Sequence, residues 1–166
     1  MSDAAAAFWR FSLAIYARPD VPPACLVLQD QHDRDVNVML FCCWLGASGR
    51  GRLDRAALDA ADRAVSGWRH DVVEHFRAAR RAIKAAALPD SDGIYAKAKA
   101  VELDAERLLQ RQLAGRAPAE NAGSSTEKRL GDALANLTLY LGDAPAAPIV
   151  GALKAMAETD FATAPA

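Results

Sequence analysis

Residues 25–46 read CLVLQDQHDRDVNVMLFCCWLG, and this stretch decides how the rest of the chain can pack. Two apolar runs flank a group of polar residues, which we call the polar knot: residues 29–35 together with Asn37. From Val38 to Leu45 every residue is apolar. A helix that is hydrophobic on all sides belongs in the middle of a protein, and this run is shorter than the roughly 20 apolar residues that cross a bilayer. It predicts a buried central helix over about residues 35–48 with a polar entrance at its start.

The remaining sequence is typical of an all-α protein. Its 166 residues are a single-domain size, long enough to bury a core. Alanine is used heavily together with other residues that favour helix, and no apolar–polar alternation continues over five residues or more. We therefore expect an irregular bundle of six to eight helices around the central helix. We expect one domain over residues 1–158 and a frayed tail over 159–166.

Breakers and helical spacing place the other helices and their buried faces. Ser66-Gly67 is expected to interrupt a helical region, and Ser124 with Glu127 forms a capping-box pattern. The predicted helices cover about residues 3–17, 24–29, 54–65, 68–87, 94–113, 124–141 and 149–158. The residues expected to face the core are Val72, Phe76, Ala79 and Ile83; Ala98, Val101, Ala105 and Leu108; and Leu130, Leu134, Leu137 and Leu141.

Charge and cysteine content narrow the classes of partner and compartment. The formal net charge of −1 provides no global field for nucleic acid or an anionic membrane, so nucleic acid is an unlikely partner and no membrane association is expected. Three cysteines and no visible signal peptide indicate a reduced, cytoplasmic protein. No phosphate-binding glycine loop, dinucleotide fingerprint or Cys-x-x-Cys pair occurs, so no cofactor is predicted. The sequence leaves the oligomeric state open.

Four cations follow one face of the 68–87 helix, and we call them the basic stripe: Arg77, Arg80, Arg81 and Lys84. Cations this close repel one another unless nearby anions neutralise their charges. Arg80 lies nearest the apolar edge and is expected to be the most buried of the four. Three interpretations are open: internal ion pairs with Asp30, Asp33, Asp35, Glu102 or Glu106; a site for an anionic ligand or acidic partner; and, third, a nucleic-acid surface.

The polar knot is a poor metal site but a good place for polar contacts. The spacing of Asp33, Asp35 and Asn37 resembles the start of a calcium loop, yet Val38 and Trp44 stand where Gly and Glu belong. One histidine is too few for a transition metal, so no metal is predicted. The two aspartates are expected to cap the central helix. The Asn37 amide must find hydrogen-bond partners in such an apolar helix. We expect Asp35 and Asn37 to line a pocket or to bond the side chains of Arg80 and Lys84.

These residues combine into one candidate cleft between the N-terminal helix, the polar knot and the basic stripe. Ser12 is expected to bond its own backbone or a polar neighbour. Trp9, Tyr16 and Trp44 would form the walls of the cleft. Arg77, Arg80 and Lys84 would supply positive charge, and Gln29, Asp35 and Asn37 would orient a ligand. Ser12 and Asp30 complete the set of candidate ligand-binding residues.

Three functional hypotheses arise from this candidate cleft. The first is a non-catalytic cytoplasmic helical protein that binds a partner protein or a small anionic ligand there. The alternative is a small enzyme acting on a phosphate- or carboxylate-bearing substrate, with Asp30 or Asp35 as acid/base. A third hypothesis, a structural adaptor, predicts an exposed apolar patch away from the polar knot.

Several motifs resemble a family of small bacterial all-helical proteins of unknown function. They are Phe8-Trp9-x-Phe11-Ser12-Leu13, Leu28-Gln29-Asp30, Asp35-Val36-Asn37, Trp44-Leu45-Gly46 and Trp68-Arg69-x-x-Val72-Val73. The resemblance covers roughly the first 110 residues. It implies a cytoplasmic bacterial protein and brings no activity, cofactor or site residue. His75-Phe76 departs from the Pro-Leu that the family resemblance leads us to expect, which puts any role for His75 in doubt.

Overall fold

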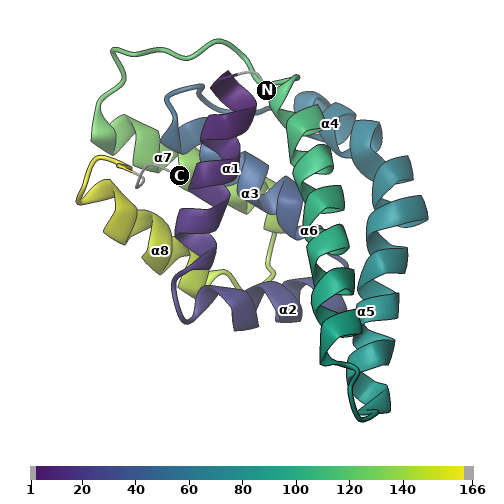
Figure 1. The fold of residues 1–166 in the computed structure, drawn as a ribbon. Helices are drawn as coiled ribbons and strands as arrows, with labels where there is room; N and C mark the ends of the chain where they lie inside the picture. Colours follow the sequence, from purple (N-terminus) through teal and green to yellow (C-terminus); the bar gives the residue numbers. More distant parts are fainter. Residues whose placement is uncertain (1–2, 163–166) are drawn as a thin grey trace.

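The protein is an all-α bundle in a computed structural model that describes residues 3–162 (Figure 1). This confirms the predicted fold class. A five-residue π-helical turn, Arg69–Val73, joins two of the α-helices. The α-helices are α1 (Asp3–Tyr16), α2 (Val21–His32), α3 (Val36–Ala47), α4 (Arg55–Trp68), α5 (Glu74–Ala86), α6 (Asp92–Ala114), α7 (Thr126–Leu141) and α8 (Ala147–Ala157).

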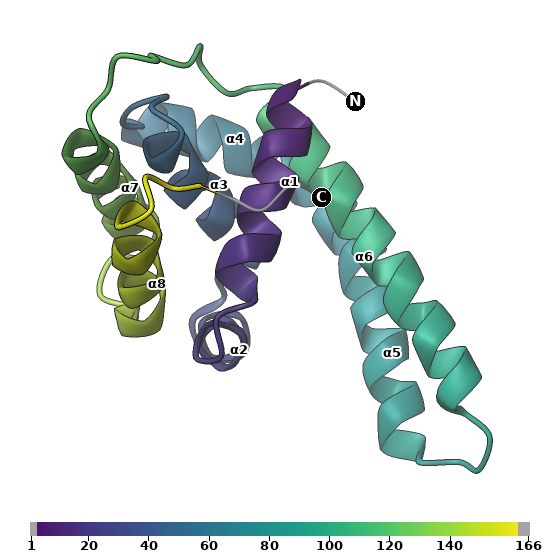
Figure 2. The ribbon, with the colours of Figure 1, turned by 60° about the vertical axis from the view of Figure 1, so that its left-hand side comes forward.

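The predicted central helix is confirmed as α3, which other helices surround in both views (Figures 1 and 2). Every residue from Asn37 to Ala47 is buried. Phe8 of α1 stacks on Trp44 of α3 with 5.0 Å between ring centroids. On another side, α7 packs so closely that Gly46 lies against its backbone at Ala133. The uniformly apolar sequence of α3 is thus matched by contacts around the whole helix.

The predicted break at Ser66-Gly67 is wrong, because the helix continues through it into the π-helical turn. Gly67 costs about 1 kcal/mol in a helix interior, and tertiary contacts offset that cost. Trp68 donates its indole N–H to the carbonyl of Ala105 at 3.0 Å. The extra residue of a π turn also rotates the succeeding residues around the helix axis. It brings Val73 onto the same buried side as Val65, and both are fully buried.

Helices α5 and α6 form a hairpin that projects from the rest of the molecule (Figure 2). The predicted core faces of both helices are wrong for most of their residues, although Ala105 is buried and Val72 packs against the core. No residue of α5 is buried, Phe76 and Ala79 are exposed, and Val101 and Leu108 are 43% and 39% exposed. The contact between α5 and α6 runs instead through ion pairs. The residues that α6 buries are Glu102, Ala105, Leu109, Gln110, Leu113 and Ala114.

The C-terminal part closes the core beside α3. Leu137 and Leu141 are buried as predicted, whereas Leu130 and Leu134 are only partly buried. The N-cap of α7 is Ser125, one residue after the predicted Ser124, and its hydroxyl accepts from the backbone N–H of Lys128. In the predicted tail Phe161 is 7% exposed and packs in the core, and residues 163–166 lie outside the described residues. Among the described helices we find no apolar segment long enough to cross a bilayer.

Candidate functional site

A polar cleft of about 590 Å³ opens where the α2–α3 link meets the π-helical turn and α5. We call it the polar cleft. Residues from five parts of the chain line it, and nearly all of them are charged or polar. They are Gln29, Asp30, Asp33, Arg34, Asp35, Asp62, Arg69, His70, Glu74, Arg77, Ala78, Arg81 and Tyr140.

The short link between α2 and α3 forms one wall. Asp33 ends α2 in the left-handed conformation (φ 50°), which short polar side chains tolerate. The chain then turns, and Asp35 caps α3, as predicted: its carboxylate accepts from the backbone N–H of Val38 at 2.9 Å. The expectation that Asp33 also caps α3 is wrong, because Asp33 is the C-cap of α2. The backbone N–H of Asp35 donates to the hydroxyl of Tyr140 at 2.8 Å. The link is thereby tied to α7, which is more than 100 residues away in sequence.

Asp35 is a buried carboxyl group at the floor of the polar cleft, with its side chain 4% exposed. Burial raises its pKa, and the hydrogen bond from Val38 and the nearby Arg69 offset only part of that rise. The Nε of Arg69 lies 3.9 Å from the Asp35 carboxylate. Arg69 is held more closely by Asp62, at 2.6 Å. One oxygen of Asp35 therefore remains weakly contacted at the edge of the cleft.

The basic stripe is largely neutralised by carboxylates, as the first of its three interpretations predicts. Arg77 donates to Glu106 at 2.8 Å and also contacts Glu102, which Arg80 contacts as well. Burial raises the pKa of Glu106 although Arg77 attracts its charged form. Arg77 is the most buried cation of the basic stripe, with 13% of its side chain exposed against 22% for Arg80. The prediction that Arg80 is the most buried is wrong, because Arg77 lies nearer the body of the molecule.

Arg81 completes the pairing at the outer edge of the polar cleft. Its guanidinium lies 3.0 Å from the carboxylate of Asp30, and both side chains are about half exposed. An exposed pair of this kind contributes little to stability. Three of the four arginines that line the cleft, Arg69, Arg77 and Arg81, thus have a carboxylate partner.

Arg34 differs from the other arginines of the cleft. It forms no ion pair with any of residues 3–162, and its buried Nε has no hydrogen-bond partner among them. Its guanidinium carbon lies 5.7 Å from the centroid of the Tyr140 ring, a cation–π contact. Burial raises the pKa of Tyr140, so its ring and hydroxyl stay neutral beside the arginine. Arg34 is therefore held in place by Tyr140, but no carboxylate among the described residues pairs with its charge.

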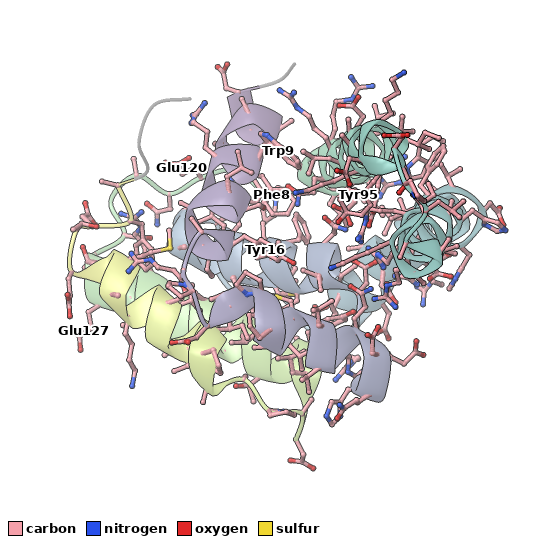
Figure 3. All side chains as sticks on the ribbon, turned by 60° about the horizontal axis from the view of Figure 1, so that its bottom comes forward. Phe8, Trp9, Tyr16, Tyr95, Glu120 and Glu127 are labelled. Carbon is pink, nitrogen blue, oxygen red and sulfur yellow. The ribbon has the colours of Figure 1, made fainter. Side chains whose placement is uncertain are left out.

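The structure brings four of the predicted site residues to the cleft and places seven elsewhere. Gln29, Asp30, Asp35 and Arg77 line it. Trp9 and Tyr16 lie on α1 (Figure 3), and Trp9 stacks under Arg107 of α6 at 5.5 Å. Tyr16 is 41% exposed. Trp44 packs between Phe8 and Arg50 in the core, Arg80 contacts Glu102, and Lys84 is exposed on α5.

Asn37 and Ser12 belong to a buried polar chain instead. The amide of Gln110 donates to the side-chain oxygen of Asn37 at 2.9 Å. The hydroxyl of Ser12 lies 3.0 Å from the Gln110 side-chain oxygen and equally far from the Phe8 carbonyl, so both predicted kinds of partner are present. The expectation that Asn37 bonds Arg80 and Lys84 is wrong, because α6 presents Gln110 to α3 at that point.

Several residues that line the polar cleft were not predicted from the sequence. Arg34 stands inside the polar knot, but nothing in its local sequence separates it from cations that the neighbouring carboxylates could neutralise. Arg69 and Asp62 come from the region that the predicted helix break divided. Tyr140 carries no sequence signal, because only folding places it next to Asp35. Within residues 3–162 no three metal-ligating side chains gather at one place.

The buried thiols show no feature of a reactive cysteine. Cys25, Cys42 and Cys43 are all free and buried. Burial raises the pKa of Cys25 and of Cys42 to about 12, so both stay protonated at neutral pH.

The comparisons with known proteins agree with the resemblance noted in the sequence. A family model described as a protein of unknown function (DUF2390) matches residues 7–113. The matched segment includes most of α1, all of α2 to α5 and nearly all of α6, and leaves out α7, which contributes Tyr140. The comparison with curated proteins and the comparison with solved structures each returned no match.

Proposed function

Because the chain belongs to a family of unknown function, DUF2390, we propose its function from the site alone: it binds a small anionic ligand, bearing a carboxylate or a phosphate, in the polar cleft. The observation that carries this proposal is Arg34. A partly buried guanidinium without a carboxylate is costly to maintain, and here it lies beside about 590 Å³ of open volume. An incoming anion would supply the missing partner.

The surroundings of Arg34 support an anion of limited size. Tyr140 holds the guanidinium against its ring, so little side-chain freedom is lost when a ligand binds. Arg69 and Arg77 also line the cleft, but each is already paired with a carboxylate, so an incoming anion would meet Arg34 as the unpaired cation. The planar donor fork of arginine suits two oxygens of one carboxylate or phosphate.

The test is a thermal-shift and calorimetric titration of the full chain with inorganic phosphate, succinate and a panel of anionic metabolites. A ligand of the folded state raises the melting temperature. We expect Arg34→Gln to weaken binding by roughly tenfold to a hundredfold, since a hydrogen bond to a charged group contributes about 1.5–3 kcal/mol.

The matched control is Arg63→Gln, which removes the same charge from the exposed side of α4. It should leave the affinity unchanged. If no anion stabilises the protein, or if Arg34→Gln binds as tightly as the natural chain, the proposal is refuted.

A second candidate function, an enzyme that uses Asp35 as acid/base, is favoured by one observation. Asp35 is a cleft carboxyl whose pKa burial raises, as is common for carboxyl groups that act as general acids or bases. Asp30 lacks this environment, because it is about half exposed and paired with Arg81. Asp35→Asn keeps an oxygen for the cap of α3. It should abolish turnover of any ligand found in the screen while leaving its binding in place.

The compartment and the class of partner belong to the same proposal. Three free, buried cysteines support a reducing compartment such as the cytoplasm. A small ligand is favoured over a partner protein at this site, because the opening is a concave cleft rather than a flat surface.

A further inference from the structure

The α5–α6 hairpin carries large apolar side chains on the side that faces away from the body of the protein. We call this side the outer face. Its residues and their exposures are Phe76 (37%), Ile94 (60%), Val101 (43%) and Leu108 (39%), with Ile83 partly buried. The hairpin projects from the bundle, so neither α1 nor α7 covers this side (Figures 1 and 2).

Helical geometry places these residues on one face. At 100° per residue, Val101 lies half a turn away from Gln110, which bonds Asn37 on the body side. Phe76 lies about 140° from Arg81, which pairs with Asp30, also on the body side. Both helices therefore turn their apolar residues away from the body, and the apolar residues of α5 and α6 form a single outer face.

The outer face overlaps the stripes that helical spacing assigns to a core. It shares Phe76, Ala79 and Ile83 of the predicted α5 stripe, and Val101 and Leu108 of the predicted α6 stripe. Ile94, Val101 and Leu108 recur every seven residues on α6. A contiguous exposed apolar face of this kind is typical of an interaction surface. The question is which surface covers it.

We propose that the outer face is the interface of a symmetric dimer, in which the hairpins of two copies pack antiparallel. The spacing on α6 is self-complementary about Val101. A two-fold axis through Val101 places Ile94 of one copy opposite Leu108 of the other, because each lies seven residues from the centre. The same patch then serves both copies, as a two-fold interface requires.

The same two-fold axis also pairs the apolar residues of α5 with those of the second copy. The ion pairs of Glu102 with Arg77 and Arg80 put residues near 80 of α5 at the level of Val101 on α6. Phe76 and Ile83 lie at nearly equal distances on either side of that level. The two-fold operation therefore places Phe76 opposite Ile83 of the second copy, with the small Ala79 near the centre.

Charges at the edge of the stripe are complementary under this operation. Lys97 and Asp104 lie on the same edge of α6, beside the stripe formed by Ile94, Val101 and Leu108. The two-fold axis brings Asp104 of the second copy to the level of residue 98, one rise of about 1.5 Å from Lys97. Two Lys97–Asp104 pairs would thus flank the apolar centre. A like-charge arrangement would have argued against a second copy.

The size of the outer face sets the expected affinity of the dimer. The α6 stripe spans about 21 Å, and two adjacent helices lie about 10 Å apart. This is at the small end of specific interfaces, so we expect dissociation in the micromolar range. The dimer leaves the polar cleft open, because that cleft lies on the body side of the hairpin.

Sedimentation equilibrium of the full chain over the micromolar range tests the proposal. The natural protein should dimerise. Val101→Glu places two glutamates together on the axis and should raise the dissociation constant by on the order of tenfold or more. Leu103→Glu is the matched control, since Leu103 is 42% exposed on another side of the same helix and should leave association unchanged. Circular dichroism verifies that both variants fold.

Charge reversal separates this dimer from non-specific association. Lys97→Glu and Asp104→Lys should each weaken the dimer, and the double variant should restore it. Val101→Cys should form an intermolecular disulfide that Leu103→Cys does not form. A chain that stays monomeric at high micromolar concentration overturns the proposal, as does a dimer that tolerates Val101→Glu. A double variant no tighter than either single charge reversal also overturns it.

Discussion

Gly46→Ala is the substitution for which the structure makes the sharpest prediction. A Cβ at position 46 would lie 2.0 Å from the backbone nitrogen and 2.4 Å from the Cα of Ala133, and 2.5 Å from the carbonyl carbon of Asp132. All three atoms belong to the backbone of α7, so no side-chain rotation can relieve the clash. The two helices would have to separate by more than about 1 Å, because carbon atoms normally approach to roughly 3.5 Å.

The magnitude results from two opposing effects. Alanine is more favourable than glycine in a helix by about 1 kcal/mol. Against this, overpacking of a dense core costs about 1–3 kcal/mol when side chains can adjust, and more when backbone must move. Separating α3 from α7 also weakens the buried hydrogen bond that the Asn136 amide of α7 donates to the Cys42 carbonyl of α3. We expect a net loss of at least about 3 kcal/mol in the free energy of unfolding, or a fall of roughly 6–12 °C in melting temperature.

Urea denaturation followed by circular dichroism measures this loss, with Gly131→Ala as the matched control. Gly131 lies within helix α7, and a Cβ there would have no neighbour within 4 Å. Its replacement should stabilise the protein by up to about 1 kcal/mol. Gly46→Ala with the stability of the natural chain would refute the close packing of α3 on α7. Equal effects of the two substitutions would do the same.

Two further predictions concern buried polar groups. Burial raises the pKa of Asp35, so the folded state binds the Asp35 proton more tightly than the unfolded state does. This tighter proton binding stabilises the fold fully below the ordinary aspartate pKa of about 4. The stabilisation is lost as the pH rises through the raised pKa of the folded state. Asp35→Asn should therefore become more stable relative to the natural chain as the pH rises through that window, and a constant difference between their unfolding free energies would contradict the pKa. Asn136→Ala removes contacts to the Leu53 N–H and to the Cys42 and Gly51 carbonyls, which should cost about 3 kcal/mol in urea unfolding. Asn121 is exposed, and its side chain accepts one hydrogen bond, from the Gly123 N–H. Asn121→Ala should therefore cost no more than about 1 kcal/mol, and similar losses for both variants would contradict a structural role for Asn136.

Much of the fold could be predicted because its signals are local. The apolar run of α3 identified the central helix, and Asp35 was readable as its N-cap from its place before the helix. The same local signals failed where two helices became one. Ser66-Gly67 resembles a break, and only the contact of Trp68 with α6 shows why the helix continues.

The candidate site was predicted in part, for the same reason. Gln29, Asp30 and Asp35 are close in sequence and stay together in the cleft, and Arg77 joins them from α5. Trp9 and Trp44 were assigned to its walls from their chemistry, but both pack elsewhere. Tyr140 could not be found, because its role depends on a contact across 105 residues.

The sequence by itself determined that this chain is helical, that residues 36–47 form a helix buried at the centre, and that cations and carboxylates must meet. These properties depend on residue type and on spacing along one helix. Only the tertiary structure decided which carboxylates pair with which cations and that Arg34 has no carboxylate partner among the described residues. It also decided that the apolar stripes of α5 and α6 face outward. Helical periodicity tells which residues share a face, but the direction of that face is set by what packs against the helix, and that surface comes from distant parts of the chain.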